Sequence, residues 1–212
     1  MLDGEKYFPV VVGVLDFLSN GNRSQFQKCI VVGIVNTDRT HDFTPTAAVS
    51  SRGGATLANS GGGPRFARFI ESELIPAAEE KLRTNGRRIV IGHSFGGLEA
   101  AYLLLHRPTC FTDYLLFDPS LWWDDFRLLE TADETVKERH QADSPANVFL
   151  GFGGEPSESP YRRSDRDLST ILQNHAPHRR HVQIKWYPDE SHGTVFVPAL
   201  YDGLRMILQT AK

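Results

Sequence analysis

The residues with the clearest chemical potential form the pentapeptide Gly92-His93-Ser94-Phe95-Gly96, which matches the pattern G-x-S-x-G. It directly follows the apolar run RRIVI and directly precedes the helical pattern GLEAAYLLLH. A serine at a sharp turn between a strand and a helix presents its hydroxyl above the end of a sheet, and the N-terminus of the helix stabilises negative charge beside it. We therefore predict that Ser94 is a nucleophile.

A serine hydroxyl is a weak nucleophile and needs a base. In the chain order that accompanies this kind of turn, the base is a histidine late in the sequence. His192, in DESHG, follows the strand-like run VQIKWY and precedes the last helical pattern, whereas the other late histidines come before that run. We predict that His192 is the base.

A third residue, an acid, would orient the imidazole and stabilise its charged form. Glu155 follows the strand-like run NVFLGF and is our first candidate. Asp118, which follows the run ending at Phe117, is the alternative. A Ser–His pair without a firmly held acid is also compatible with the sequence.

The remaining site residues follow from the geometry that this chemistry needs. An oxyanion hole requires two backbone N–H groups, and we expect these from Phe95, directly after the nucleophile, and from Glu5. Trp122 and Trp123 follow the strand that ends at Phe117, and we expect one to pack in the core and the other to line a substrate pocket. Arg39 either binds an anionic or catecholate oxygen of a substrate or pairs with Asp38 or Asp42.

These residues require a sheet whose strands end at one edge. Short β-branched runs alternate with segments of three-to-four apolar spacing, which predicts an α/β fold with a mostly parallel sheet and helices on both faces. Ligand sites of such sheets lie at the carboxyl ends of the strands. The segment 7–18 fits a strand or a helix, and we favour a helix. We expect one domain over residues 1–212, with strands at 28–36, 87–93, 114–117, 147–152 and 182–187, and with the other helices at 64–83, 98–106, 121–140, 162–175 and 195–209.

Composition narrows the classes of partner. The formal net charge is -3 and no basic block is present, so we do not expect nucleic-acid binding. The longest apolar runs are about half the length that a membrane-spanning helix needs. The two cysteines make no disulfide framework, and no Cys/His spacing indicates a metal. We expect a small-molecule ester as the substrate, no cofactor, and leave the oligomeric state open.

Several segments together resemble the “Putative esterase” family of α/β-hydrolases, and within it the enterochelin (siderophore) esterase-like, IroE-like branch. They are GHSFGG, DPSLWW, ESHGTVFVPALYDGLRMI, LDGEKYF and VVGIVNTDRTHDFTPT, and they extend from residue 2 to about residue 208. The resemblance implies an α/β-hydrolase fold, hydrolysis of carboxylic esters including siderophore lactones, no metal or organic cofactor, and Ser94 with His192 as the catalytic pair. It also implies a weak or absent third member, which bears on Glu155.

The sequence departs from this family at its start, because family members carry strands before the LDG segment and here Met1 directly precedes it. We expect an N-terminally truncated α/β-hydrolase whose neighbouring strands lose backbone partners. The alternatives to a serine esterase are an acyltransferase with the same site and a catalytically impaired, truncated protein of this fold. For the chain as it stands we expect a cytoplasmic location, with a periplasmic one open if a leader precedes it.

Overall fold

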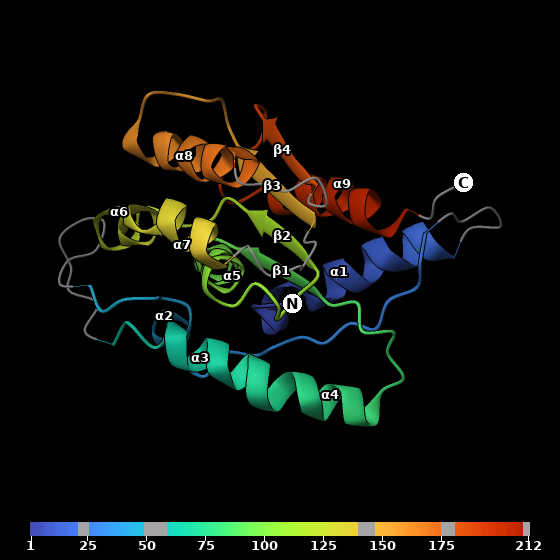
Figure 1. The fold of residues 1–212 in the computed structure, drawn as a ribbon. Coiled ribbons are helices and arrows are strands. Elements are labelled where there is room, and N and C mark those ends of the chain that lie inside the picture. Colours follow the sequence, from blue (N-terminus) through green and yellow to red (C-terminus); the bar gives the residue numbers. More distant parts are fainter. Residues whose placement is uncertain (21–25, 49–58, 140–146, 175–180, 210–212) are drawn as a thin grey trace.

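The computed structural model describes residues 1–20, 26–48, 59–139, 147–174 and 181–209. Its centre is a four-stranded sheet with every neighbouring pair parallel, in the order β1-β2-β3-β4 (Figure 1). The strands are β1 (Ile89–His93), β2 (Asp113–Phe117), β3 (Asn147–Gly153) and β4 (Val182–Tyr187). Each is joined to the next through helix, as parallel strands require. The predicted α/β class is confirmed.

Helices cover both faces of the sheet, so the inner strands are buried on both sides. On one face, the helix after β1 packs with the helices that follow β2 and β3, and on the other face the first and last helices lie together (Figure 1). The helices are α1 (Gly4–Ser19), α2 (Arg39–Asp42), α3 (Gly63–Phe69), the π-helix η1 (Ile70–Leu74), α4 (Ile75–Lys81), α5 (Phe95–His106), α6 (Trp123–Glu130), α7 (Ala132–Arg139), α8 (Pro160–Asn174) and α9 (Phe196–Leu208).

The register of the sheet brings three chain segments, those after β1, β2 and β3, to one edge. His93, the last residue of β1, lies opposite Phe117, the last of β2, and Phe117 lies opposite Gly151 of β3. The residues that follow these strands therefore emerge side by side. This edge is where the sequence places its candidate site residues.

The helix favoured for residues 7–18 is confirmed as α1, which buries one stripe of side chains, including Tyr7, Val11 and Leu15, against α9 and the sheet. The helix expected over 64–83 forms α3, η1 and α4 in unbroken succession. The helix expected over 121–140 is instead divided into α6 and α7, and three residues within α6, Asp124 to Phe126, have left-handed backbone angles. Its expected last residue, His140, and the expected last residue of the 162–175 helix, His175, lie outside the described residues.

The strand expected at residues 28–36 is wrong: no sheet ladder runs through this segment, and Ile30 and Val35 are exposed. The reason is the position of Met1 and Leu2. The N–H of Ile34 donates to the carbonyl of Met1, at 3.0 Å, and the N–H of Leu2 donates to the carbonyl of Ile91, also at 3.0 Å. The first two residues therefore lie between this segment and β1, and the apolar run has no strand of its own to pair with.

A largely apolar cavity of about 490 Å³ lies beside Met1 and the 27–34 segment. Its lining includes Val11, Leu15, Ile70, Leu74 and Ile91. The cavity is bounded by the 27–34 segment, by the successive helices η1 and α4, and by α1. The Ser94 turn and the segments around His192 do not line it. Its lining includes charged side chains, such as Glu79, Arg87 and Arg88, but none of the site residues that the sequence predicts.

The packing of β3 against α9 gives a direct test of the fold. Phe149 is fully buried and contacts Phe117 with ring centroids 6.3 Å apart. We expect Phe149→Ala to lower the free energy of unfolding by about 3–5 kcal/mol, because it leaves a cavity in the core. Urea denaturation measures this change. The control is Phe17→Ala on α1, where the side chain is 74% exposed, and which should change stability by less than about 1 kcal/mol. Equal losses for the two variants would contradict the packing.

Candidate active site

Ser94 occupies a strained turn between β1 and α5. Its backbone angles are φ 60° and ψ -121°, a left-handed region that costs a non-glycine residue about 1–3 kcal/mol. The turn is tight: a Cβ on Gly92 would lie 2.1 Å from the carbonyl oxygen of Gly96. The N–H of Ser94 donates to the carbonyl of Phe117, at 3.1 Å, which fixes the turn to the end of β2. The strand–turn–helix context expected from the sequence is therefore present.

His192 lies on the loop between β4 and α9 and reaches the same edge. Its Nδ1 is 2.7 Å from Oδ2 of Asp118, and its ring lies 4.7 Å from that of His93, centroid to centroid. His93 directly precedes Ser94, so the histidine predicted as base and the serine predicted as nucleophile share one neighbourhood. In this structure the Oγ of Ser94 lies 3.4 Å from the Oγ of Ser120. Between Ser94 and His192, both described residues, no direct hydrogen bond joins Oγ to the imidazole. Catalytic hydrogen bonds often tighten only when substrate binds.

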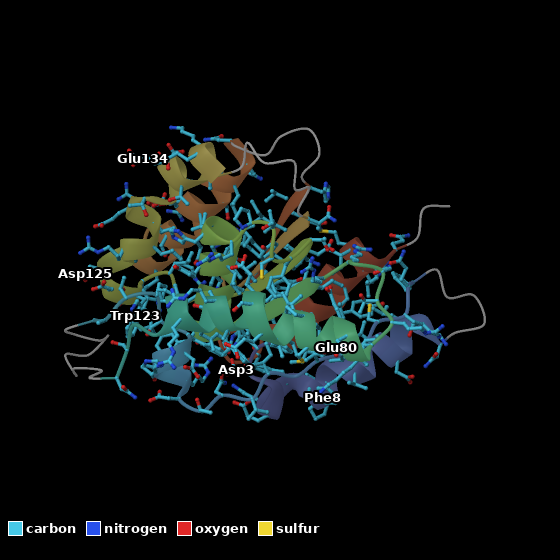
Figure 2. The ribbon with its side chains drawn as sticks, turned by 60° about the horizontal axis from the view of Figure 1, so that its bottom comes forward. Asp3, Phe8, Glu80, Trp123, Asp125 and Glu134 are labelled. Carbon is cyan, nitrogen blue, oxygen red and sulfur yellow. The ribbon has the colours of Figure 1, made fainter. Side chains whose placement is uncertain are left out.

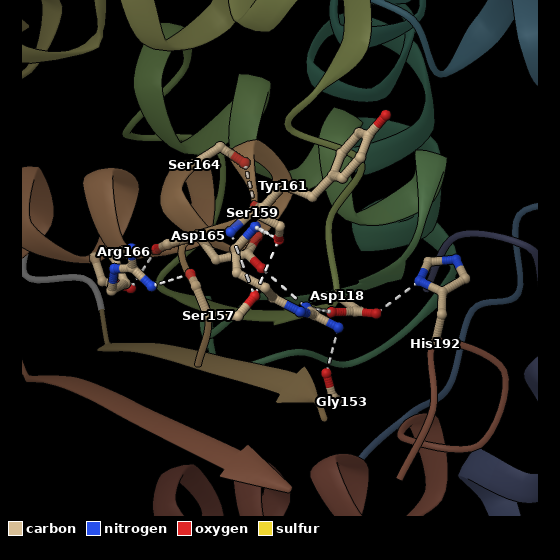
Figure 3. Close-up of polar contacts among 11 residues, drawn as sticks. Asp118, Gly153, Ser157, Ser159, Tyr161, Ser164, Asp165, Arg166 and His192 are labelled. Carbon is tan, nitrogen blue, oxygen red and sulfur yellow. Dashed lines mark hydrogen bonds and ion pairs between the residues drawn. The ribbon is translucent and has the colours of Figure 1, made fainter. Parts of the chain in front are cut away.

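Asp118 directly follows β2 and is 5% exposed. One carboxylate oxygen faces His192, and the other accepts from the guanidinium of Arg162 at 2.7 Å (Figure 3). Burial alone would raise the pKa of this carboxyl group, but the hydrogen bonds from His192 and Arg162 and the charge of Arg162 outweigh it and lower the pKa below its ordinary value. Asp118 is therefore held as a carboxylate against the imidazole.

This geometry favours Asp118 over Glu155, our first choice of acid. Gly154, with φ 80°, turns the chain after β3 and bonds its N–H to the carbonyl of Tyr187. The side chain of Glu155 is then exposed, while Nδ1 of His192 is taken by Asp118. The lengths of β2 and β3 explain why Asp118, and not Glu155, reaches the histidine. β3 extends to Gly153, two residues past the point where β2 ends opposite Gly151, so the acid nearest the histidine comes from the shorter strand.

A second series of contacts holds the loop of His192, and no local sequence pattern indicates it. Nε2 of His93 lies 2.7 Å from the backbone carbonyl of His192, and Nδ1 of His93 lies 2.9 Å from the hydroxyl of Tyr7. A carbonyl only accepts, so Nε2 carries the proton and Nδ1 accepts from Tyr7. Burial lowers the pKa of His93 to about 4, with the charge of His192 adding to the effect, so His93 is neutral near pH 7.

The two donors predicted for an oxyanion hole belong to the N-termini of α1 and α5. Phe95 is the first residue of α5 and Glu5 the second of α1. The starts of the two helices are adjacent. A Cβ atom placed on Gly96 of α5 would lie only 3.1 Å from the carboxylate of Asp3, which directly precedes α1. The first N–H groups of a helix have no partner inside the helix. The positions are compatible with an oxyanion hole, and the roles of Phe95 and Glu5 stay predictions.

Arg39 has a partner that the sequence did not suggest. Its guanidinium forms a two-point ion pair with Asp3, at 2.6 and 2.9 Å, and lies 5.4 Å from the ring of Phe95. Figure 2 shows Asp3 where α1 begins, near the short helix α2 that carries Arg39. The expected pairing with Asp38 or Asp42 is therefore not what holds Arg39. Its role toward substrate stays a prediction.

The two tryptophans differ in the way that we expected of the pair. Trp123 is 2% exposed, and its indole N–H donates to the carbonyl of Thr46 at 3.0 Å, so it packs in the core and is not available to a substrate. Trp122 is partly exposed and lies 6.0 Å from Phe95 and 6.4 Å from Tyr161, centroid to centroid. Trp122 is thus the candidate for substrate contact.

Among the described residues, no group of three or more His, Cys, Asp or Glu side chains is arranged to hold a metal ion. None of their helices is both long enough and apolar enough to cross a membrane.

Comparisons with known proteins give a consistent result. The family model described as “Putative esterase” matches residues 1–198. A “Siderophore triacetylfusarinine C esterase” of Aspergillus fumigatus is 28% identical over 196 residues, which cover 81% of this chain and 64% of the relative. The “Ferri-bacillibactin esterase BesA” of Bacillus subtilis is 30% identical over 148 residues, 64% of this chain and 51% of the relative. The chain thus spans between about half and two thirds of these relatives.

A solved structure agrees with the fold. The crystal structure of an IroE-like serine hydrolase from Shewanella oneidensis superimposes with a TM-score of 0.86 at 35% sequence identity. The match covers 98% of this chain and 68% of that chain. The arrangement of sheet and helices described above is therefore an α/β-hydrolase fold.

The buried His93 predicts a pH dependence of stability. Its pKa is about 4 in the folded protein and ordinarily 6.5, so between these values the unfolded chain binds the additional proton. Stability should therefore fall as the pH is lowered from about 6.5 to about 4, by roughly 3 kcal/mol from this group. Urea denaturation of the unmodified protein and of His93→Gln across this range measures the contribution, because the difference cancels other titrating groups. Identical pH profiles for the two proteins would rule it out.

Proposed function

Because the chain belongs to the “Putative esterase” family, we propose that it is a serine esterase that hydrolyses carboxylic esters. We assign Ser94 as the nucleophile, His192 as the base and Asp118 as the acid. The observation that carries this assignment is the 2.7 Å contact between Nδ1 of His192 and the buried carboxylate of Asp118, at the edge where the strained turn presents Ser94. That contact leaves Nε2 of the imidazole for the proton of the nucleophile.

The reaction then follows from the positions of these groups. Ser94 attacks the ester carbonyl carbon while Nε2 of His192 takes the hydroxyl proton, and the backbone N–H groups of Phe95 and Glu5 stabilise the oxyanion. The imidazolium is stabilised by Asp118 and gives its proton to the leaving alcohol. A water molecule, deprotonated by His192, attacks the acyl-enzyme, and collapse of the second tetrahedral intermediate returns the proton to Ser94.

The surroundings of Ser94 support an ester with an aromatic or polar group. Trp122, Phe95 and Tyr161 form a partly exposed aromatic cluster beside the turn. The guanidinium of Arg39, which is ion-paired with Asp3, lies over the ring of Phe95. The names of the matched relatives include siderophore esterases, and we propose siderophore esters or other small esters as the substrate class. The same cluster would accommodate the aryl group of a simple test ester.

Replacement of the nucleophile tests the proposed activity. We expect Ser94→Ala to lower kcat on a p-nitrophenyl ester by up to about a million-fold, the loss seen when a serine hydrolase loses its nucleophile. The rate of nitrophenol release measures this, and labelling by a fluorophosphonate should disappear in the same variant. Retention of most of the activity by Ser94→Ala would refute the assignment.

The identity of the acid has its own test, because the chain offers two matched carboxylates. We expect Asp118→Asn to lower kcat on the order of ten-thousand-fold, since an amide cannot stabilise the imidazolium as a carboxylate does. Glu155→Gln should leave kcat within about twofold, because its side chain is exposed and the imidazole is bonded elsewhere. Steady-state kinetics of the two variants decide between the acids. The reverse order of effects would restore Glu155.

A further inference from the structure

Arg162, in the first turn of α8, lies behind the proposed acid. One guanidinium nitrogen donates to Oδ1 of Asp118 at 2.7 Å, and another donates to the carbonyl of Gly153 at the end of β3 (Figure 3). The side chain is largely buried, and its guanidinium lies 5.6 Å from the ring centroid of Trp186. A planar group fixed at several points leaves little freedom to the carboxylate that it binds.

The same guanidinium also binds a second buried carboxylate. Nη1 of Arg162 donates to Oδ2 of Asp165 at 2.9 Å, and Asp165 is 3% exposed. The two carboxylates thus share one positive group, and only Asp118 contacts the histidine. Asp165 takes no part in the reaction proposed above. Burying its carboxyl group costs free energy, which only hydrogen bonds and ion pairs with neighbouring groups such as Arg162 can offset.

We propose that Arg162 and Asp165 form a positioning pair: Arg162 holds Asp118 in register with His192, and Asp165 fixes Arg162 and sets the net charge that the imidazole experiences. This inference rests on the proposed function, because it concerns the acid of that site. The pair acts through Asp118, and neither residue touches the reacting atoms. It is a structural device that the family match does not supply.

Charge gives the pair an effect that a purely structural contact lacks. Burial raises the pKa of Asp165 to about 7, with the charge of Asp118 adding to the effect and Arg162 opposing it. Near neutral pH, the pair of Arg162 and Asp165 therefore has a net charge of about +1 when Asp165 is protonated and no net charge when Asp165 is ionised. Among the described residues, two other titratable groups lie near the imidazole and Asp165. They are Asp118, which is ionised, and His93, which is neutral near pH 7.

The signs of the two charges are opposite, and so are their effects on His192. The positive Arg162 disfavours the imidazolium, whereas the negative form of Asp165 favours it. Removing Arg162 should raise the apparent pKa of the acidic limb of the pH–activity profile by about one pH unit or more, for charges that interact at an effective dielectric constant of about 20. Asp165→Asn should lower this apparent pKa by a smaller amount, because Asp165 is only partly ionised near pH 7.

The experiment compares Arg162→Gln, Arg162→Lys and Asp165→Asn by pH profiles of kcat and KM on a p-nitrophenyl ester. The control is Arg163→Gln, at the neighbouring position on α8, where the arginine is exposed. We expect Arg162→Gln to lower kcat about a hundred-fold, with KM little changed, because the imidazole loses its alignment. Arg162→Lys should keep the acidic limb near its original pH but recover only part of kcat, since lysine provides a point charge without the planar fork. Arg163→Gln should match the unmodified protein in every respect.

The experiment distinguishes failure of the positioning pair from failure of the proposed esterase function. If Ser94→Ala and Asp118→Asn abolish activity but Arg162→Gln and Asp165→Asn leave both kcat and the acidic limb unchanged, the positioning pair is refuted and the esterase assignment stands. Shifts of the acidic limb in the same direction in both variants also refute the pair. If Arg162→Gln does not fold, as judged by its melting curve, Asp165→Asn is compared with Arg162→Lys, in which the acidic limb should stay in place and kcat should fall. An unchanged kcat in Arg162→Lys together with an unchanged acidic limb in Asp165→Asn then overturns the inference.

Discussion

The hydrogen bond between Asp118 and His192 is the contact on which the proposed site depends. It joins the end of β2 to the loop before α9, two segments that are 74 residues apart in the chain. The contact is possible because β1, β2 and β3 are parallel and in a register that ends them near one another. A carboxylate that is buried and still ionised can then face an imidazole beside the strained turn of Ser94.

The surrounding contacts restrain the two ends of that bond. Tyr7 and His93 fix the backbone of His192 from the side of α1, and Arg162 fixes the carboxylate of Asp118 from the side of α8. The first restraint comes from the face of the sheet that α1 and α9 cover, and the second comes from the face that α8 covers. Helices distant from the reacting atoms therefore contribute to alignment, which is where a small displacement has a large effect on rate. The strained turn of Ser94 is held to the end of β2 by the hydrogen bond from its N–H to the carbonyl of Phe117.

Local patterns in the sequence were sufficient for part of this description. The turn around Ser94, the four strands of the sheet and the helix α1 follow from residue types and spacing. The choice of Asp118 over Glu155 does not, because it depends on how far β3 extends past β2. The segment 28–36 has the composition of a buried strand, but pairing is decided by neighbours, and Met1 and Leu2 lie between it and β1. Likewise, neither Tyr7 nor Arg162 has a local signal, because their partners are distant in sequence.

One measurement tests the central contact directly. In protein labelled with ¹⁵N-histidine, the Nδ1 proton of His192 should give a strongly deshielded proton resonance at a pH where the imidazole is charged, because it is shared with a carboxylate. We predict that this resonance is lost in Asp118→Asn and kept in Glu155→Gln. A resonance that survives the loss of the Asp118 carboxylate, or that disappears with Glu155, would contradict the geometry from which the proposed mechanism is derived.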